Sequence, residues 1–199
     1  MQVLELDLNK LWGHRSPDEA FLLIFPRAIY AMLEQPSASR SGSSSLRGIT
    51  RRVLVLVATK YGQSASITSG LVRLLLECEH LAAPLAELAP RSSIAGNEET
   101  AEAESLLEEG AGVRLVTDLL SQLTGLATAE IGVDSAGPKN ISAFLQAVAA
   151  RSPLILLVNL QLLLPHLDAE AYQLRCGAVS AFGELMVHVT DAGLEPSAH

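Results

Sequence analysis

The chain has 199 residues, which is enough for one domain with a sizeable core or for one stretch of a helical array. Hydrophobic residues make up 49% of it and aromatic residues only 4%, so the core must be built from Leu, Ala, Val and Ile. This composition favours helices packed on helices and argues against a β-sandwich. The formal net charge of −8, taken over the whole chain, argues against a nucleic-acid partner.

Cysteine content and hydropathy point to a compartment. Cys78 and Cys176 lie far apart and cannot form the disulfide framework of a small secreted domain, so a reducing compartment is expected. The first residues lack a basic stretch followed by an apolar core, so we expect no secretory signal. The most apolar run, residues 153–164, is shorter than the roughly 20 residues that span a bilayer. The sequence therefore predicts a soluble intracellular protein that has no membrane partner.

The pattern of the first half of the chain predicts helices joined by short polar segments. A Ser-Pro-Asp-Glu start at residue 16 predicts a helix over 17–34, followed by a serine-rich loop over 37–45. Apolar spacing predicts further helices over 46–61, 65–78 and 81–88. Short turns between them favour antiparallel neighbours.

An acidic segment divides the chain. Six glutamates, three glycines and no basic residue lie between Arg91 and Arg114. This composition predicts an insert over 93–112 that is at least partly disordered. Residues 1–92 are then an N-terminal helical array, and residues 113–199 form helical hairpins that continue the same solenoid.

The last third has the most regular pattern. Helices are predicted over 113–126, 140–150 and 152–167, and Asp168 is expected to cap a further helix that runs to 189. Apolar residues cover so wide an arc of this last helix that it must be packed from two sides. The predicted fold class is therefore all-α, with antiparallel helical hairpins stacked as an α-solenoid.

The segment 162–168, together with the helix after it, resembles a HEAT repeat. HEAT repeats have an apolar first helix, an Asp in the turn and an Arg early in the second helix, and Asp168 and Arg175 stand at those structural positions. Asp168 could accept hydrogen bonds from the free amides of the second helix. Arg175 could reach the Asp of a neighbouring repeat.

Several separated blocks, in the same order, resemble the N-terminal region of the condensin complex subunit 1 family, the HEAT-repeat non-SMC subunit of condensin. These blocks are residues 8–12, 33–36, 61–66, 75–84, 137–145 and 163–175. Departures are Ala136 and Ala169, where the family usually has Ser and Gly, and the acidic insert. The family's proteins are several times longer, so this chain would be a piece of one.

Few residues are candidates for catalysis or metal binding. Cys78-Glu79-His80 comes nearest to a metal or nucleophile site, but zinc needs about four ligands and Cys176 has no His at a suitable spacing. His166 is interpreted as a helix C-terminal residue that interacts with the dipole. Asp168 with Glu170 is better explained by capping than by acid–base catalysis. Because phosphate-loop and nucleophile-elbow motifs are also absent, we predict no enzyme, cofactor, metal or small-molecule substrate.

Charge is unevenly distributed. Residues 35–76 carry six basic side chains and no acidic one, a local charge of +6. The candidate contacts with DNA phosphates in this basic strip are Arg47, Arg51, Arg52 and Lys60. The alternative, a solvated face paired with the acidic insert, stays open.

The resemblance implies a non-catalytic regulatory scaffold subunit of condensin that acts in mitotic chromosome condensation. Its expected partners are the kleisin and SMC subunits, with DNA or chromatin as a further candidate. Its expected location is the nucleus and chromosomes, with a cytoplasmic pool. The alternative hypothesis is a generic HEAT-repeat adaptor without a DNA role. An enzyme that uses Cys78 or His80 is the third hypothesis.

Overall fold

The computed structural model describes residues 51, 54–55, 57–59, 62–91, 103–126, 131–132 and 135–191. The predicted helix over 17–34 and the serine-rich loop over 37–45 lie outside these residues, as do the ends of the chain. The predicted helix over 46–61 is described only in part, and its described residues, 51, 54–55 and 57–59, are all helical.

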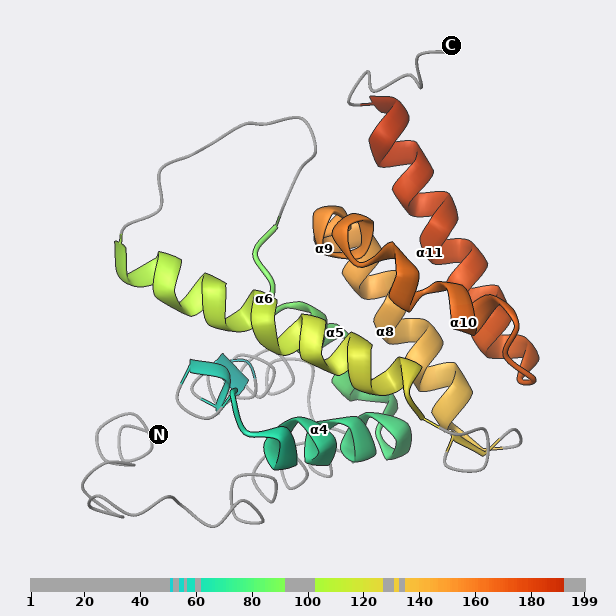
Figure 1. The fold of residues 1–199 in the computed structure, drawn as a ribbon, viewed down its shortest axis with the longest axis horizontal. Helices are drawn as coiled ribbons and strands as arrows, with labels where there is room; N and C mark the ends of the chain where they lie inside the picture. The colour runs from blue at the N-terminus through green and yellow to red at the C-terminus, as the bar shows by residue number, and fades with distance from the viewer. Residues whose placement is uncertain are drawn as a thin grey trace, which may run out of the picture.

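Every regular element in the described ranges is a helix. Those with defined bounds are, in chain order, α4 (Ala65–Glu77), η1 (Glu79–Leu81), α5 (Ala82–Ala86), α6 (Ala103–Thr124), α8 (Gly137–Arg151), α9 (Pro153–Val158), η2 (Leu160–Leu162), α10 (Leu164–Leu167) and α11 (Tyr172–Asp191) (Figure 1). Here η marks a short 3₁₀ helix. The all-α prediction is confirmed, and the predicted helices over 65–78 and 81–88 match α4 and the η1–α5 pair closely.

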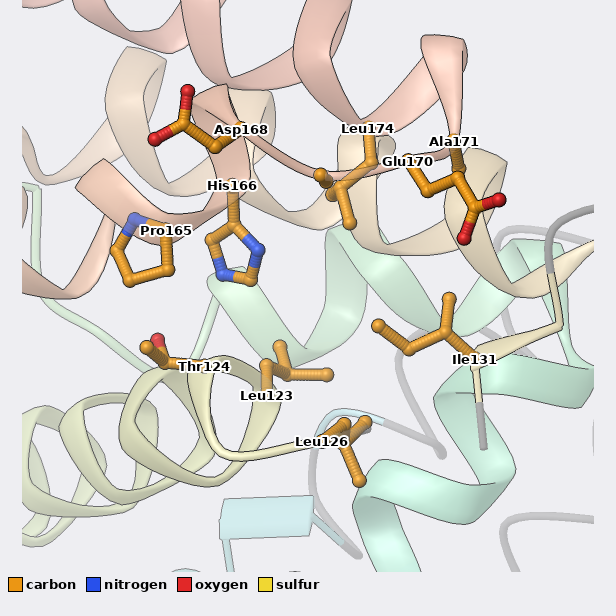
Figure 2. Close-up of a pocket in the computed structure, with 11 residues that line it drawn as sticks. Leu123, Thr124, Leu126, Ile131, Pro165, His166, Asp168, Glu170, Ala171 and Leu174 are labelled. Carbon is orange, nitrogen blue, oxygen red and sulfur yellow. The ribbon is translucent and has the colours of Figure 1, made fainter. Parts of the chain in front are cut away.

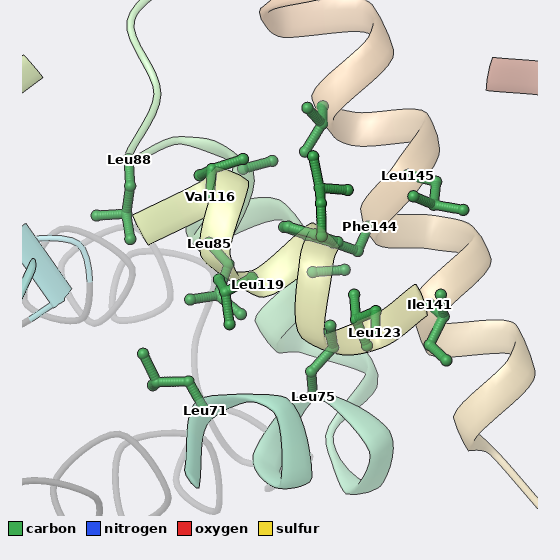
Figure 3. Close-up of a cluster of buried hydrophobic side chains, with 14 of the residues drawn as sticks. Leu71, Leu75, Leu85, Leu88, Val116, Leu119, Leu123, Ile141, Phe144 and Leu145 are labelled. Atoms are coloured by element: carbon green, nitrogen blue, oxygen red, sulfur yellow. The ribbon is translucent and has the colours of Figure 1, made fainter. Parts of the chain in front are cut away.

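The helices pack around one aliphatic core. Figure 3 shows side chains from α4, α5, α6 and α8 that gather at the centre, among them Leu75, Leu85, Leu119 and Phe144. Each of these four is completely buried. The core is otherwise built almost entirely from Leu, Val, Ile and Ala, as the composition predicted.

Helices α8 and α11 lie side by side and run in the same direction, with α9 and α10 beside them on the return path (Figure 1). Equivalent helices of successive repeats in a solenoid have this relationship, since each hairpin stacks on the one before it. The arrangement is consistent with the predicted HEAT-like stacking.

Helix α6 begins at Ala103, ten residues before the predicted start, so the second half of the predicted insert is helical. The first turns are rich in Ala, Glu and Leu, which are strong helix formers and outweigh two glycines. One of those glycines has a packing role. A Cβ atom on Gly112 would lie 2.8 Å from the carbonyl carbon of Leu88, so the α6 backbone approaches the end of the α5 segment directly.

The single helix predicted over 152–167 is wrong, because the structure divides it into α9, η2 and α10. Asn159 ends α9, and its side-chain Nδ2 donates a hydrogen bond to the Ile155 carbonyl at 2.8 Å, in competition with the backbone ladder. Pro165 then removes one amide donor from the next stretch.

The predicted cap of the last helix is also corrected. Asp168 stands at the C-terminal end of α10, and α11 begins four residues later at Tyr172. Arg175 folds back onto the turn between them: Nη1 donates to the carbonyls of Ala169 at 2.6 Å and Glu170 at 2.8 Å. The hydrogen bonds of Arg175 therefore stabilise the turn of its own hairpin, whereas a contact with a neighbouring repeat was predicted.

Candidate functional site

Arg151, the last residue of α8, is influenced electrostatically by two arginines from distant parts of the chain. Arg151 donates from Nε to the Ala89 carbonyl at 2.9 Å and from Nη2 to the Glu87 carbonyl at 3.4 Å. Partial burial lowers the pKa of Arg151, and the positive charges of Arg91 and Arg51 lower it further, while Glu87 acts in the opposite direction. We call Arg51, Arg91 and Arg151 the arginine cluster.

Only one member of the predicted basic strip is placed in this cluster. Arg51 is exposed and described, whereas Arg47, Arg52 and Lys60 lie outside the described residues. Arg91, which is exposed, and Arg151, which is half-buried, lie beyond residues 35–76, and the strip did not include them. The sequence did contain a signal for Arg91 and Arg151, because each lies at or shortly after the end of a predicted helix, where positive charges are favoured.

A second feature is a cavity of about 270 Å³ between the C-terminal end of α6 and the turn from α10 to α11 (Figure 2). Its lining is Leu123, Thr124, Leu126, Ile131, Pro165, His166, Asp168, Ala169, Glu170, Ala171 and Leu174. The Thr124 hydroxyl is engaged with the carbonyls of Leu120 at 2.9 Å and Leu162 at 2.8 Å, which ties α6 to η2 at the wall of the cavity.

His166 is the buried polar group of this cavity. It sits in the last turn of α10 with 4% of its surface exposed, and Figure 2 shows its ring directed toward Leu123 and Thr124. Burial lowers its pKa below the ordinary value of 6.5, so the imidazole is neutral at pH 7. The predicted place at a helix C-terminus is correct, but a neutral ring makes no charge–dipole interaction.

A third feature is an uncovered apolar face. On α11, three side chains spaced along one stripe are largely exposed: Tyr172 at 71%, Val179 at 61% and Met186 at 60%. Leu154, Leu157 and Val158 of α9 are also exposed. We call the α11 residues Tyr172, Val179 and Met186 the α11 stripe. Exposed apolar stripes of this kind mark surfaces to which other chain segments or partners bind.

The two residues of the enzyme hypothesis differ in burial, since Cys78 is half-buried against the core and His80 lies on the surface. His80 is exposed, and neither Cys78 nor Cys176 forms a disulfide. Glu79 pairs with Lys139 at 2.8 Å, and this hydrogen bond and charge lower its pKa. Within the described ranges no three His, Cys, Asp or Glu side chains are grouped to hold a metal ion. In the same ranges, no helix has the length and apolar character that crossing a bilayer requires.

These features define a class of protein: stacked helices that offer a basic cluster, an apolar face and a small cavity. Comparison with known proteins shows what the chain is similar to. Residues 1–67 match the family described as non-SMC mitotic condensation complex subunit 1, N-term. Condensin complex subunit 1 of Mus musculus is 29% identical over 199 residues, which is 99% of this chain and 13% of that protein.

Two further relatives agree. Condensin complex subunit 1 of Homo sapiens is 28% identical over 189 residues, covering 94% of this chain and 12% of that protein. The Saccharomyces cerevisiae protein of the same name is 29% identical over 189 residues, covering 94% of this chain and 14% of that protein. The resemblance read from the sequence is confirmed: the chain is similar to condensin complex subunit 1, and it spans about an eighth of the length of those relatives.

Proposed function

We propose that this chain is part of a non-catalytic regulatory scaffold subunit of condensin that acts in mitotic chromosome condensation, in the nucleus and on chromosomes. The similarity to condensin complex subunit 1 over nearly the whole chain carries this proposal. The surface of the chain supports this proposal, because stacked helices with an exposed apolar stripe can bind a partner without a catalytic group. The kleisin and SMC subunits of condensin are the proposed partners.

The full-length protein that contains this chain, co-expressed with the kleisin and SMC subunits, is expected to co-elute with them in size-exclusion chromatography. Replacing Val179 and Met186 by Glu is expected to weaken co-elution, because charges would interrupt the α11 stripe. The matched control replaces Gln173 and Ser180, which are exposed polar residues of the same helix, by Glu. Failure of the unaltered protein to co-elute would refute the scaffold proposal. Equal assembly of both double variants would exclude the α11 stripe as the contact.

DNA is the further proposed partner, bound through the phosphate backbone at the arginine cluster. Arg47, Arg52 and Lys60 remain candidate contacts alongside it. Arg51 and Arg91 are exposed and their positive charges act on Arg151, and each phosphate that such arginines contact releases counterions. This observation favours condensin-like chromosome binding over the generic adaptor, which has no need of such a cluster.

Replacing Arg51 and Arg91 by Gln is expected to reduce the slope of log affinity for duplex DNA against log salt by about two units, one per lost phosphate contact. Fluorescence anisotropy at several salt concentrations measures this slope. The control variant replaces Arg114 and Lys139 by Gln, which removes the same charge from exposed positions outside the cluster. DNA binding that is absent, or equally affected by both variants, would favour the adaptor without a DNA role.

A further inference from the structure

Helix α11 lies at one edge of the described helices and carries a regular seam on its outer face (Figure 1). We call this set of residues, spaced alternately by four and three, the α11 seam: Tyr172, Cys176, Val179, Gly183, Met186 and Thr190. Cys176 is half-buried and the other five are exposed, whereas Leu174 and Leu185 on the opposite face are buried. The same spacing places the a and d residues of a coiled coil against a second helix. The seam therefore has the pattern of a helix–helix contact, although no described element covers it.

Gly183 makes a notch in the middle of the α11 seam. A Cβ atom on Gly183 would meet nothing within 4 Å, so the space above it is open. One turn to either side, Val179, Met186 and Val187 are exposed by 61%, 60% and 53%, so the notch has an apolar rim. A glycine in a helix interior lowers helix stability but allows another backbone or side chain to approach closely. The notch therefore fits one apolar side chain of a second helix.

An antiparallel copy of α11 supplies a fitting side chain at every position of the seam. The symmetric alignment that places a side chain over the notch pairs Val179 with Gly183, Met186 with Cys176, and Tyr172 with Thr190. Each pair joins a larger side chain to a smaller one, and none of the six residues is charged. A parallel alignment would place each residue against itself, with tyrosine on tyrosine and a gap at Gly183. The seam is therefore self-complementary about a two-fold axis, as an isologous dimer requires.

The exposed apolar area determines how strong such a contact can be. A fully exposed aliphatic side chain presents roughly 100 Å² of apolar surface. Large apolar side chains on this face are exposed by 53% to 71% and together offer roughly 250 Å² per protomer: Tyr172, Val179, Met186 and Val187. Because about 57% of a typical interface is apolar, the whole contact would bury roughly 900 Å² over both copies. Stable complexes bury about 1,200–2,000 Å², so this area corresponds to a weak, reversible dimer.

We propose that a second copy of this chain binds the α11 seam as an antiparallel, two-fold symmetric dimer, with Val179 of each copy in the Gly183 notch of the other. The inference goes beyond the proposed function, because it names what covers α11 when no condensin partner is bound. A second copy and a condensin partner would compete for this face. The experiments use the 199-residue chain alone, so their failure is distinct from a failure of condensin assembly.

A disulfide across the seam tests the register. Met186→Cys places a thiol opposite Cys176 of the other copy, so oxidised glutathione is expected to link two chains and double the mass of 21.1 kDa on a non-reducing gel. The two thiols lose two protons and two electrons to oxidised glutathione, which becomes two reduced molecules. Gln173→Cys is the matched control, because this exposed position of α11 lies about 20 Å along the helix from the residue opposite Cys176. Equal cross-linking of both variants would overturn the register.

The notch is tested with Gly183→Leu, whose side chain would stand where Val179 of the other copy enters. Sedimentation equilibrium over a wide range of protein concentration is expected to show dimerisation weakened about tenfold. Circular dichroism is expected to be unchanged, since the space above Gly183 is open within the chain. Glu184→Leu adds the same side chain beside the seam and is expected to leave dimerisation unaffected. The proposal is overturned if Gly183→Leu dimerises as well as the unaltered chain, or if the unaltered chain is monomeric throughout, which would leave α11 to a different polypeptide.

Discussion

Replacing Gly177 by Ala is expected to lower the free energy of unfolding by about 3 kcal/mol or more, at the upper end of the cost of overpacking a core. A Cβ atom on Gly177 would lie 2.5 Å from the Cβ and 2.7 Å from the Cα of Ser142, closer than real side chains approach. Both residues are buried between α11 and α8. Because Ser142 Cα belongs to a helix backbone, rotamer changes cannot relieve the clash and the two helices must separate. Urea unfolding followed by circular dichroism measures the loss.

Gly183→Ala is the matched control. Gly183 lies on the same helix, and its added Cβ would meet nothing within 4 Å. The substitution should raise the free energy of unfolding by about 0.5–1 kcal/mol, since alanine is the better helix former. If both variants were equally stable, α8 and α11 would not be in the backbone contact that the structure shows.

The contact at Gly177 could not be predicted from the sequence. The pattern of the last helix predicted packing from two sides, and Ala178 and Ala181 of this helix are indeed fully buried. A backbone approach that the pattern did not predict is made by the preceding residue, Gly177, against Ser142 of α8. That contact depends on how α8 and α11 are rotated about their axes, which the periodicity of one helix does not specify.

Some helix boundaries could likewise be predicted from the sequence, and others could not. Helix α4 and the α6 core face were predictable, since their apolar residues recur at helical spacing and become buried. The start of α6 was missed because acidic composition was taken as a sign of disorder, although Glu is a good helix former. The interruption after Val158 coincides with a side-chain hydrogen bond of Asn159 to the Ile155 carbonyl, which helical periodicity does not reveal.

The candidate sites were only partly visible in the sequence. The basic strip led to Arg51, and tertiary packing brings the charges of Arg51 and Arg91 within electrostatic reach of Arg151. His166 was correctly placed at the end of a helix. Its burial comes from the C-terminal end of α6, about 40 residues earlier in the chain, so its unsatisfied nitrogen could not be inferred from local pattern.

Phe144→Ala is expected to lower the free energy of unfolding by about 3–5 kcal/mol, measured by urea unfolding. Phe144 is the largest of the completely buried side chains in the described ranges, and its helix α8 contacts α4, α5 and α11, so the cavity left behind would lie where several helices meet. Phe182→Ala on α11 is the control, because that ring is only partly buried and its loss removes less apolar area from contact. Similar losses in both variants would mean that the core is not centred on α8. A larger loss at Phe144 would agree with a core centred on α8.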